Sequence, residues 1–271
     1  MTQLSTGRFP DPDRYTAYLQ TVEGRLRAEL GWLNLRGFLP ASGAGQRALD
    51  VGGGTGTLSL RLAALGFEVE LLDSSAAMLA VARKEAEASA LSGRISFRHA
   101  DVNRVSDLLE PSSFDLVVCH NLLEYVDDPS AVLRSLAQLL RKGANAVLSL
   151  LTRNRYGEVL KAAIKSRDLE LAKTALSAET VLDSLYGQPL RVFDPVEVCV
   201  MAEQAGLELL AQRGVRVVAD YLDCEALTED AYQRLLDLEL LLGAQPHLAA
   251  IARYTQIIAC TSFPAAGGRR K

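Results

Sequence analysis

Four short polar segments of the 271-residue chain have the residue types that bind a nucleotide-like ligand. The first is the glycine-rich run Asp50-Val51-Gly52-Gly53-Gly54-Thr55-Gly56, which follows the apolar pair Ala48-Leu49. Glycine lets the backbone turn sharply, and it lets a ligand approach atoms that a Cβ would shield. A helix beginning directly after this run would present free N–H groups to that ligand. The run therefore predicts the nucleotide-binding corner of a parallel α/β sheet.

Each of the other three segments follows a predicted strand. Asp73 follows residues 68–72, Asp101-Val102 lies just after residues 95–99, and residues 120–125 (His-Asn-Leu-Leu-Glu-Tyr) follow residues 114–119. In open α/β sheets, ligands bind outside the carboxyl ends of the strands. A carboxylate at Asp73 can accept hydrogen bonds from a ribose diol, and Asp101 can accept one from an adenine amino group. Together the segments favour a ligand that contains adenosine.

The glycine spacing bears on which ligand this is. A dinucleotide fingerprint has glycine at its first, third and sixth positions. Gly52 and Gly54 fit the first two, but Thr57 stands at the sixth. The spacing therefore disfavours a nicotinamide dinucleotide. A different adenosine-containing cofactor, or a loop that binds nothing, remains compatible with the glycines alone.

The elements that must position these residues alternate along the chain. Predicted strands occupy residues 47–51, 68–72, 95–99, 114–119 and 144–151, and helices occupy 57–65, 75–89 and 129–140. Such alternation implies right-handed crossovers and a doubly wound parallel sheet. Further strands are predicted at 207–210, 215–218 and 254–261, with helices at 195–205 and 228–242. The predicted fold is α/β: a Rossmann-like, seven-stranded, mostly parallel sheet with helices on both faces and a helical insertion after the fifth strand.

We divide the chain into five segments. The segment 1–44 is helical and covers the cofactor site, with one or two helices between Arg14 and Leu39. The insertion or lid, 152–193, is expected to contain helices near 158–173 and 178–185 and no strand. The remaining segments are the cofactor-binding core (45–151), the C-terminal completion of the sheet with the substrate side (194–263), and a flexible tail (264–271).

Composition restricts the partners. The formal net charge of −4 gives no overall attraction to nucleic acid, so a nucleic-acid substrate would need a local basic patch. Residues 153–173 are the most basic stretch, with six basic and three acidic residues.

The cysteines and histidines lack metal-ligand spacing, so no metal site is predicted. Without a signal peptide or an apolar run long enough to cross a bilayer, we expect a cytoplasmic protein with no membrane partner. No feature of the sequence indicates an oligomeric state.

Residues 50–56, Asp73-Ser-Ser-Ala-Ala-Met78, Asp101 and residues 120–125 resemble the successive motifs of class I S-adenosylmethionine-dependent methyltransferases. The resemblance implies that S-adenosylmethionine lies across residues 52–56, with its ribose held by Asp73 and its sulfonium end near His120. The cofactor-binding residues that it implies are Arg27, Asp50, Gly52, Gly53, Gly54, Gly56, Asp73, Ser74, Met78, Asp101, Val102, His120 and Asn121.

Residues 24–27, 120–125, 214–222 and 252–254 also resemble the bacterial tRNA 5-carboxymethoxyuridine methyltransferases. These enzymes methyl-esterify the carboxylate of a modified wobble uridine. The resemblance places Arg27 beside the methionine carboxylate of the cofactor, and Tyr221 and Arg253 at the substrate end. Two features depart from that family: residues 174–190 contain only acidic charges where it has a lysine-rich run, and Ala219 stands where a polar residue is expected.

The chemistry depends on the methyl acceptor. A carboxylate is already ionised and needs no general base, and Arg253 or Arg216 could bind it bidentately while Tyr221 donates a hydrogen bond. A hydroxyl or amine would need a base, for which His120 and Glu124 are candidates. Tyr221, Arg253 and His120 are therefore the predicted catalytic residues. Three functions follow: a tRNA wobble-uridine carboxyl methyltransferase, a methyltransferase of a small metabolite, or a non-catalytic S-adenosylmethionine-binding protein.

Overall fold

The computed structural model describes residues 11–143, 145–222 and 227–261, and its centre is a seven-stranded sheet. The strand order is β3-β2-β1-β4-β5-β9-β8. The first five strands in this order pair in parallel, and β9 runs antiparallel between β5 and β8. The sheet confirms the predicted fold. Its strands are β1 Arg47–Val51, β2 Glu68–Asp73, β3 Ile95–His99, β4 Leu116–His120, β5 Val147–Arg153, β8 Leu207–Val215 and β9 Tyr254–Thr261.

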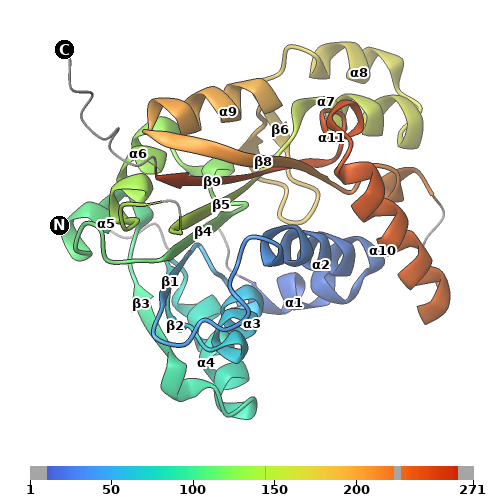
Figure 1. The fold of residues 1–271 in the computed structure, drawn as a ribbon. Helices are drawn as coiled ribbons and strands as arrows, with labels where there is room; N and C mark the ends of the chain where they lie inside the picture. The colour runs from blue at the N-terminus through green and yellow to red at the C-terminus, as the bar shows by residue number, and fades with distance from the viewer. Residues whose placement is uncertain (1–10, 144, 223–226, 262–271) are drawn as a thin grey trace, which may run out of the picture.

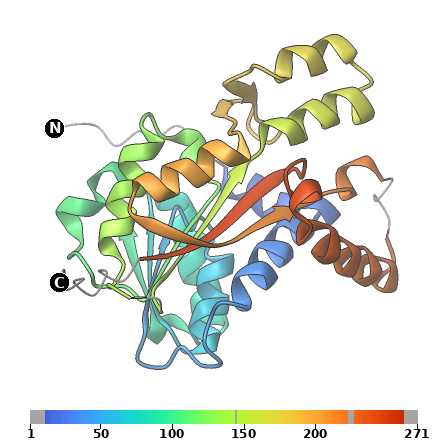
Figure 2. The same cartoon turned by 45° about the horizontal axis from the view of Figure 1, so that its top comes forward.

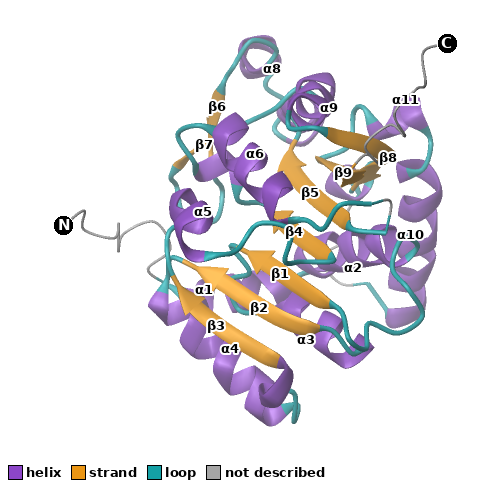
Figure 3. Ribbon diagram, turned by 60° about the vertical axis from the view of Figure 1, so that its left-hand side comes forward, coloured by secondary structure: helices purple, strands orange, loops and turns teal. Residues whose placement is uncertain are grey.

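Helices cover both faces of this sheet (Figure 3). The buried residues of β4, such as Val117 and Val118, pack on opposite faces because side chains alternate along a strand. A strand covered on both faces is continuously apolar, as residues 116–119 are. One face carries α2 (Val22–Arg36), α3 (Thr57–Leu65) and α4 (Ala76–Ala88). The other carries α5 (Val105–Leu108), α6 (Pro129–Leu139) and α9 (Pro195–Gln204).

Local sequence signals set the ends of several helices. Asp128 caps α6 by accepting a hydrogen bond from the backbone N–H of Ala131 at 2.8 Å, and Pro129 occupies the first turn. Asp194 caps α9 in the same way, and Glu197 completes a capping box. Gly66, with φ of +108°, ends α3 in the left-handed conformation. The predicted boundaries of the helices in the core are therefore confirmed to within one residue.

The N-terminal segment forms two helices, α1 (Pro12–Gln20) and α2, which meet at Thr21. The Thr21 hydroxyl caps α2 by accepting from the backbone N–H of Gly24 at 3.1 Å. Buried residues of α2 pack with α10 (Glu229–Gly243), and the two helices lie side by side in Figure 1. A short helix, α11 (Pro246–Ala249), leads from α10 to β9. Residues 1–10 and the predicted tail 264–271 lie outside the described residues.

The insertion differs from the prediction in its second half. It begins with α7 (Arg155–Leu160), which continues as a π-helical turn over Lys161–Lys165 and is followed by α8 (Leu169–Ala175). The predicted helix over 178–185 is wrong, as is the expectation that the insertion has no strand. A hairpin of β6 (Thr180–Leu182) and β7 (Pro189–Arg191) forms there instead. Pro189 and the left-handed Gly187 (φ +67°) favour this turn and oppose a helix.

One further strand prediction is wrong. Residues 207–210 and 215–218 were expected to form separate strands, but 207–215 form the single strand β8, with a bulge between Leu209 and Ala211. The strand ends because Arg216 adopts a φ of +63°, which breaks the extended backbone. Two other predicted strands are shifted: 114–119 becomes 116–120, and 144–151 becomes 147–153.

The insertion stands out from the body of the molecule (Figure 2). The helices α7 and α8 project beyond the sheet, and the chain then returns through the hairpin to α9. Within the part of the chain that the structure describes, no helix has the length and apolar character to cross a membrane.

Candidate cofactor and acceptor site

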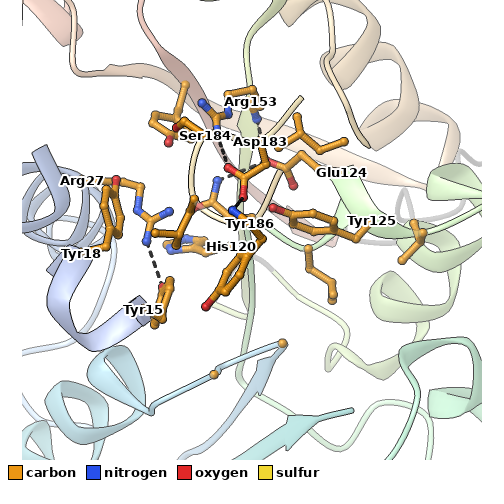
Figure 4. A pocket seen from close by; sticks show the side chains of 18 of the residues that line it. Tyr15, Tyr18, Arg27, His120, Glu124, Tyr125, Arg153, Asp183, Ser184 and Tyr186 are labelled. Atoms are coloured by element: carbon orange, nitrogen blue, oxygen red, sulfur yellow. Dashed lines mark hydrogen bonds and ion pairs between the residues drawn. The ribbon is translucent and has the colours of Figure 1, made fainter. Parts of the chain in front are cut away.

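A cavity of about 580 Å³ opens at the carboxyl ends of the parallel strands (Figure 4). Its walls come from all parts of the chain. The strand-end loops contribute Gly52, Asp73 and His120, while α1 and α2 contribute tyrosines and Arg27. The insertion and the C-terminal part supply most of the other charged groups: Arg153, Lys161, Lys165, Asp183, Arg216, Asp220 and Arg253.

The glycine loop is shaped by both backbone conformation and space. Gly52, Gly54 and Gly56 have φ values of +68°, +55° and +78°, which side chains rarely adopt. A Cβ on Gly53 would lie 2.8 Å from Oδ2 of Asp50. On Gly54, which lines the cavity, the nearest heavy atom to a Cβ would be Cε1 of Tyr15 at 3.9 Å. The loop thus leaves room at Gly54 for a ligand to approach its backbone.

Asp50, Gly53 and Gly56 do not line the main cavity. Asp50 is buried and accepts a hydrogen bond from the Ser59 hydroxyl at 2.7 Å, and burial raises its pKa to about 6. Asp50 and Gly53 border a smaller cavity of about 80 Å³, which also touches Gly52 and His120. Gly56 borders neither cavity, and its Cβ would lie 3.0 Å from that of Ala82. Within this arrangement, Asp50 and Gly56 support the loop.

Asp73 joins the end of β2 to the glycine loop. Its Oδ2 accepts a hydrogen bond from the N–H of Gly54 at 2.9 Å, and its Oδ1 accepts one from the N–H of Ser75 at 2.8 Å. Burial raises the pKa of this carboxyl. A carboxylate has about four acceptor positions, so these hydrogen bonds leave room for a ligand's hydroxyl group. The cavity wall beside it contains Ser74, Met78, Asp101 and Val102, all named from the sequence. The carboxylate acceptors Asp73 and Asp101 fit the hydroxyl and amino groups of the adenosine part of S-adenosylmethionine.

Arg27 and His120 lie where the two cavities meet. Arg27 donates a hydrogen bond to the Tyr15 hydroxyl at 2.9 Å, and its guanidinium lies 4.8 Å from the ring centroid of Tyr18. Burial acts to lower the pKa of Arg27, but the neighbouring tyrosines outweigh it and the pKa is raised. Arg27 therefore keeps its charge, as a group that binds a carboxylate must.

His120 is a weak base in this setting. Its Nε2 lies 2.8 Å from the Ser149 hydroxyl, and burial together with the charge of Arg27 lowers its pKa to about 3. Asn121, which follows it with a φ of +54°, also lines the cavity and donates to Oε1 of Glu124 at 3.1 Å. Burial raises the pKa of Glu124. Of the two candidate bases, only Glu124 has a pKa shifted in the direction that suits general-base catalysis near neutral pH.

Three buried arginines and the half-buried Arg27 surround one tyrosine of the cavity wall. We call Arg27, Arg153, Arg216 and Arg253 the arginine cluster. The Tyr254 ring centroid lies 6.0, 5.0 and 5.7 Å from the guanidinium carbons of Arg27, Arg153 and Arg216. Burial raises the pKa of Tyr254, but the four arginines outweigh it and the pKa falls to about 8. The cluster is thus an electropositive wall that favours an anion.

Three acids balance this charge. Glu158 pairs with both Arg153 at 3.2 Å and Arg253 at 2.7 Å. Asp220 pairs with Arg216. Asp183, from the turn of the β6–β7 hairpin, pairs with Arg153 at 3.5 Å, as Figure 4 shows.

Sequence reasoning found only part of this cluster. It named Arg27, Arg216 and Arg253 but missed Arg153 and Tyr254, which are direct partners in the β5–β9 ladder. Arg153 is the last residue of β5, so the strand-end rule that found Asp73 would have indicated Arg153 if the strand had been placed correctly.

Tyr221 does not line the cavity, whereas its neighbour Asp220 does, so a substrate role for Tyr221 stays a prediction. No cluster of three potential metal ligands occurs among residues 11–143, 145–222 and 227–261.

Comparisons with known proteins identify the family of the chain. Residues 22–212 match the family model described as a methyltransferase domain. The chain is 33% identical over 241 residues to the tRNA 5-carboxymethoxyuridine methyltransferase of Escherichia coli K12, covering 88% of this chain and 89% of that protein. It is 41% identical over 112 residues to the ubiquinone biosynthesis O-methyltransferase of Xanthomonas euvesicatoria, covering 41% of this chain and 45% of that protein.

The fold has counterparts among solved structures. An S-adenosylmethionine-dependent methyltransferase from Mesorhizobium loti superposes with a TM-score of 0.59 at 21% sequence identity, covering 86% of this chain and 99% of that one. The family match spans the glycine loop, Asp73, Asp101 and His120, so the residues that line the cofactor end of the cavity lie inside it. The chain therefore belongs to the methyltransferase domain family and is an S-adenosylmethionine-dependent methyltransferase.

Proposed function

We propose that this enzyme methylates the carboxylate of 5-carboxymethoxyuridine at the wobble position of tRNA. The observation that carries the proposal is the arginine cluster, whose three buried members and the half-buried Arg27 all line the cavity that contains the strand-end residues. Arginine is the side chain best suited to hold a carboxylate in a fixed orientation. The E. coli relative, whose name specifies this modified uridine, is similar over 88% of the chain.

The transfer needs little from the protein beyond positioning. S-adenosylmethionine supplies a methyl group on a positively charged sulfur. A lone pair of the acceptor carboxylate attacks the methyl carbon; a carbon–oxygen bond forms as the carbon–sulfur bond breaks, and the electron pair goes to sulfur. No proton moves, so the low basicity of His120 is no obstacle. Holding the two reactants in line accounts for much of the catalysis in such a step.

Each part of the cluster has a task in this proposal. Arg27, next to His120 and the glycine loop, binds the carboxylate of the cofactor. Arg153 and Arg253, which share Glu158, orient the carboxylate of the acceptor. Lys161 and Lys165 also line the cavity, and they belong to the basic stretch 153–173 predicted to offer a patch for nucleic acid. These lysines favour a substrate with phosphates near the entrance.

A small metabolite with a hydroxyl group is the second candidate acceptor. Its support is Glu124, which is 4% exposed and lines the cavity, and whose Oε2 has no hydrogen-bond partner among the described residues. A buried carboxylate with a raised pKa could accept the proton of a hydroxyl as the methyl group arrives. The partial similarity to an O-methyltransferase of ubiquinone biosynthesis agrees with such an acceptor.

Incubation with methyl-labelled S-adenosylmethionine distinguishes the two. Purified enzyme is given either tRNA that contains unesterified 5-carboxymethoxyuridine or a tRNA-free metabolite extract. We expect label in the tRNA, and we expect mild alkali to release it because methyl esters hydrolyse there and O-methyl ethers do not. Alkali-stable label in the metabolite fraction, with none in tRNA, would favour the second candidate.

A further inference from the structure

The turn of the β6–β7 hairpin lies across the cavity and reaches the N-terminal helix. Asp183, Ser184, Leu185 and Tyr186 of this turn all line the cavity. The Tyr186 hydroxyl donates a hydrogen bond to the backbone carbonyl of Asp11 at 3.0 Å. The turn thus connects the insertion to the start of α1, and Figure 4 shows Asp183, Ser184 and Tyr186 of the turn among the side chains that line the cavity.

Asp183 differs from the other acids of the arginine cluster in where it comes from. Glu158 lies in α7 and is not part of the cavity wall, and Asp220 lies in the 3-10 turn Ala219–Tyr221, which borders the cavity. Asp183 belongs to the turn, is 6% exposed, and lies with its Oδ1 3.5 Å from Nη2 of Arg153. Its Oδ2 accepts a hydrogen bond from the N–H of Tyr186 at 2.9 Å.

The charges around Arg153 leave little room for a further anion. Arg153 already pairs with Glu158 and Asp183. An acceptor carboxylate approaching the same guanidinium would meet Asp183 at short range in a buried site, where like charges repel strongly. Glu158 is held by Arg253 as well, but Asp183 has no second arginine among the ion pairs of the described residues. Asp183 is therefore the acid that can be exchanged.

We propose that Asp183 is a displaceable counter-ion of Arg153: its carboxylate occupies Arg153 until the carboxylate of the methyl acceptor replaces it. The inference rests on the proposed carboxylate acceptor. A neutral acceptor brings no charge to compensate Arg153, so Asp183 stays in place and the acceptor gains nothing from the arginine. The exchange thus couples the entry of an acceptor carboxylate to movement of the turn, and the charge of Asp183 lowers the affinity for that carboxylate.

Asp183→Asn tests the exchange because it removes the charge while the side-chain carbonyl can still accept from the N–H of Tyr186. Binding of the nucleoside 5-carboxymethoxyuridine and of its neutral methyl ester is measured by calorimetry in the presence of S-adenosylhomocysteine. We expect the variant to bind the carboxylate about fivefold more tightly or better, and the ester as wild type does.

Asp127→Asn is the matched control. Asp127 also lines the cavity, and it forms no ion pair with the cluster among the described residues. An equal gain in carboxylate affinity in both variants would show a general change in the electrostatic potential of the cavity, and it would overturn the inference. Unchanged or weaker carboxylate binding by Asp183→Asn would also overturn it, leaving Asp183 as a residue that shapes the turn.

The two proposals fail in different ways. Wild-type enzyme that transfers no methyl group to tRNA overturns the proposed function, and the inference with it. Wild-type transfer to tRNA, combined with a KM for tRNA that Asp183→Asn does not lower, overturns the inference alone.

Discussion

Arg153, the last residue of β5, pairs across the sheet with Tyr254, the first residue of β9, and its guanidinium lies 5.0 Å from the centroid of the tyrosine ring. Because β9 runs antiparallel to β5, its first residue meets the carboxyl end of the parallel strands. That is the edge where α/β sheets bind ligands. The antiparallel strand is what brings Tyr254 and Arg253 to the cofactor site.

Asp73→Ala should weaken S-adenosylmethionine binding by about 100-fold or more, since hydrogen bonds to charged groups contribute about 1.5–3 kcal/mol each. The substitution also removes the acceptor for the N–H of Gly54. Calorimetric titration with the cofactor measures the effect. Asp73→Asn, which keeps one acceptor oxygen, should lose less, and an unchanged affinity in Asp73→Ala would show that the cofactor is placed wrongly.

Arg253→Ala should lower kcat/KM for the acceptor by about 100-fold, because it deletes a buried cation and leaves Glu158 with one arginine fewer. Cofactor affinity should stay close to that of wild type, since Arg27 rather than Arg253 borders the glycine-loop end. Transfer rates and calorimetry on the same preparation test both halves. If kcat/KM and cofactor affinity both matched those of wild type, Arg253 would have only a structural role.

Acceptor binding should weaken as the pH rises through about 8. Tyr254, whose pKa is lowered to about 8, becomes a phenolate in that range and competes with the acceptor carboxylate for the arginines. Because the folded-state pKa lies below the unfolded value, ionised Tyr254 also stabilises the fold: its contribution is complete above the unfolded pKa and disappears as pH falls through about 8.

Tyr254→Phe should remove both effects of pH. The KM of the variant for tRNA should not change with pH in the range where the KM of wild type rises. Its free energy of unfolding should be lower than that of wild type only at alkaline pH. Steady-state kinetics and urea unfolding across the range pH 7 to about 10 measure these differences. A wild-type KM that does not change above pH 8 would contradict the expected competition.

Gly56→Ala should destabilise the fold by about 3 kcal/mol, combining left-handed backbone strain with crowding against Ala82. Gly206 provides the control: its φ is +82°, but a Cβ there meets nothing within 4 Å. Gly206→Ala should therefore cost only about 1 kcal/mol of strain. Urea unfolding of both variants compares the two, and equal losses would refute the packing argument.

The sequence predicted the parallel core well because its signals are local. Apolar runs of strand length, N-cap acids and the left-handed Gly66 each act within a few residues. The predicted cofactor-binding residues Asp73, Asp101 and His120 followed from a general rule about strand ends, and all three line the cavity.

The part of the cavity that contains Arg153 and Tyr254 was harder to predict because long-range pairing builds it. Tyr254 is recognisable as a site residue only once β9 is known to run antiparallel beside β5. Asp183 falls within the predicted helix 178–185, whereas the observed hairpin depends on pairing with 189–191. Short strands gain their stability from such partners rather than from propensity.

The central claim is that the enzyme esterifies a wobble uridine of tRNA. The most direct measurement is mass spectrometry of tRNA nucleosides from cells in which the gene for this chain has been deleted. We predict that the methyl ester of 5-carboxymethoxyuridine disappears, that the free acid accumulates, and that the wild-type gene restores the ester while its Arg253→Ala variant does not. A nucleoside profile that is identical with and without the gene would contradict the claim.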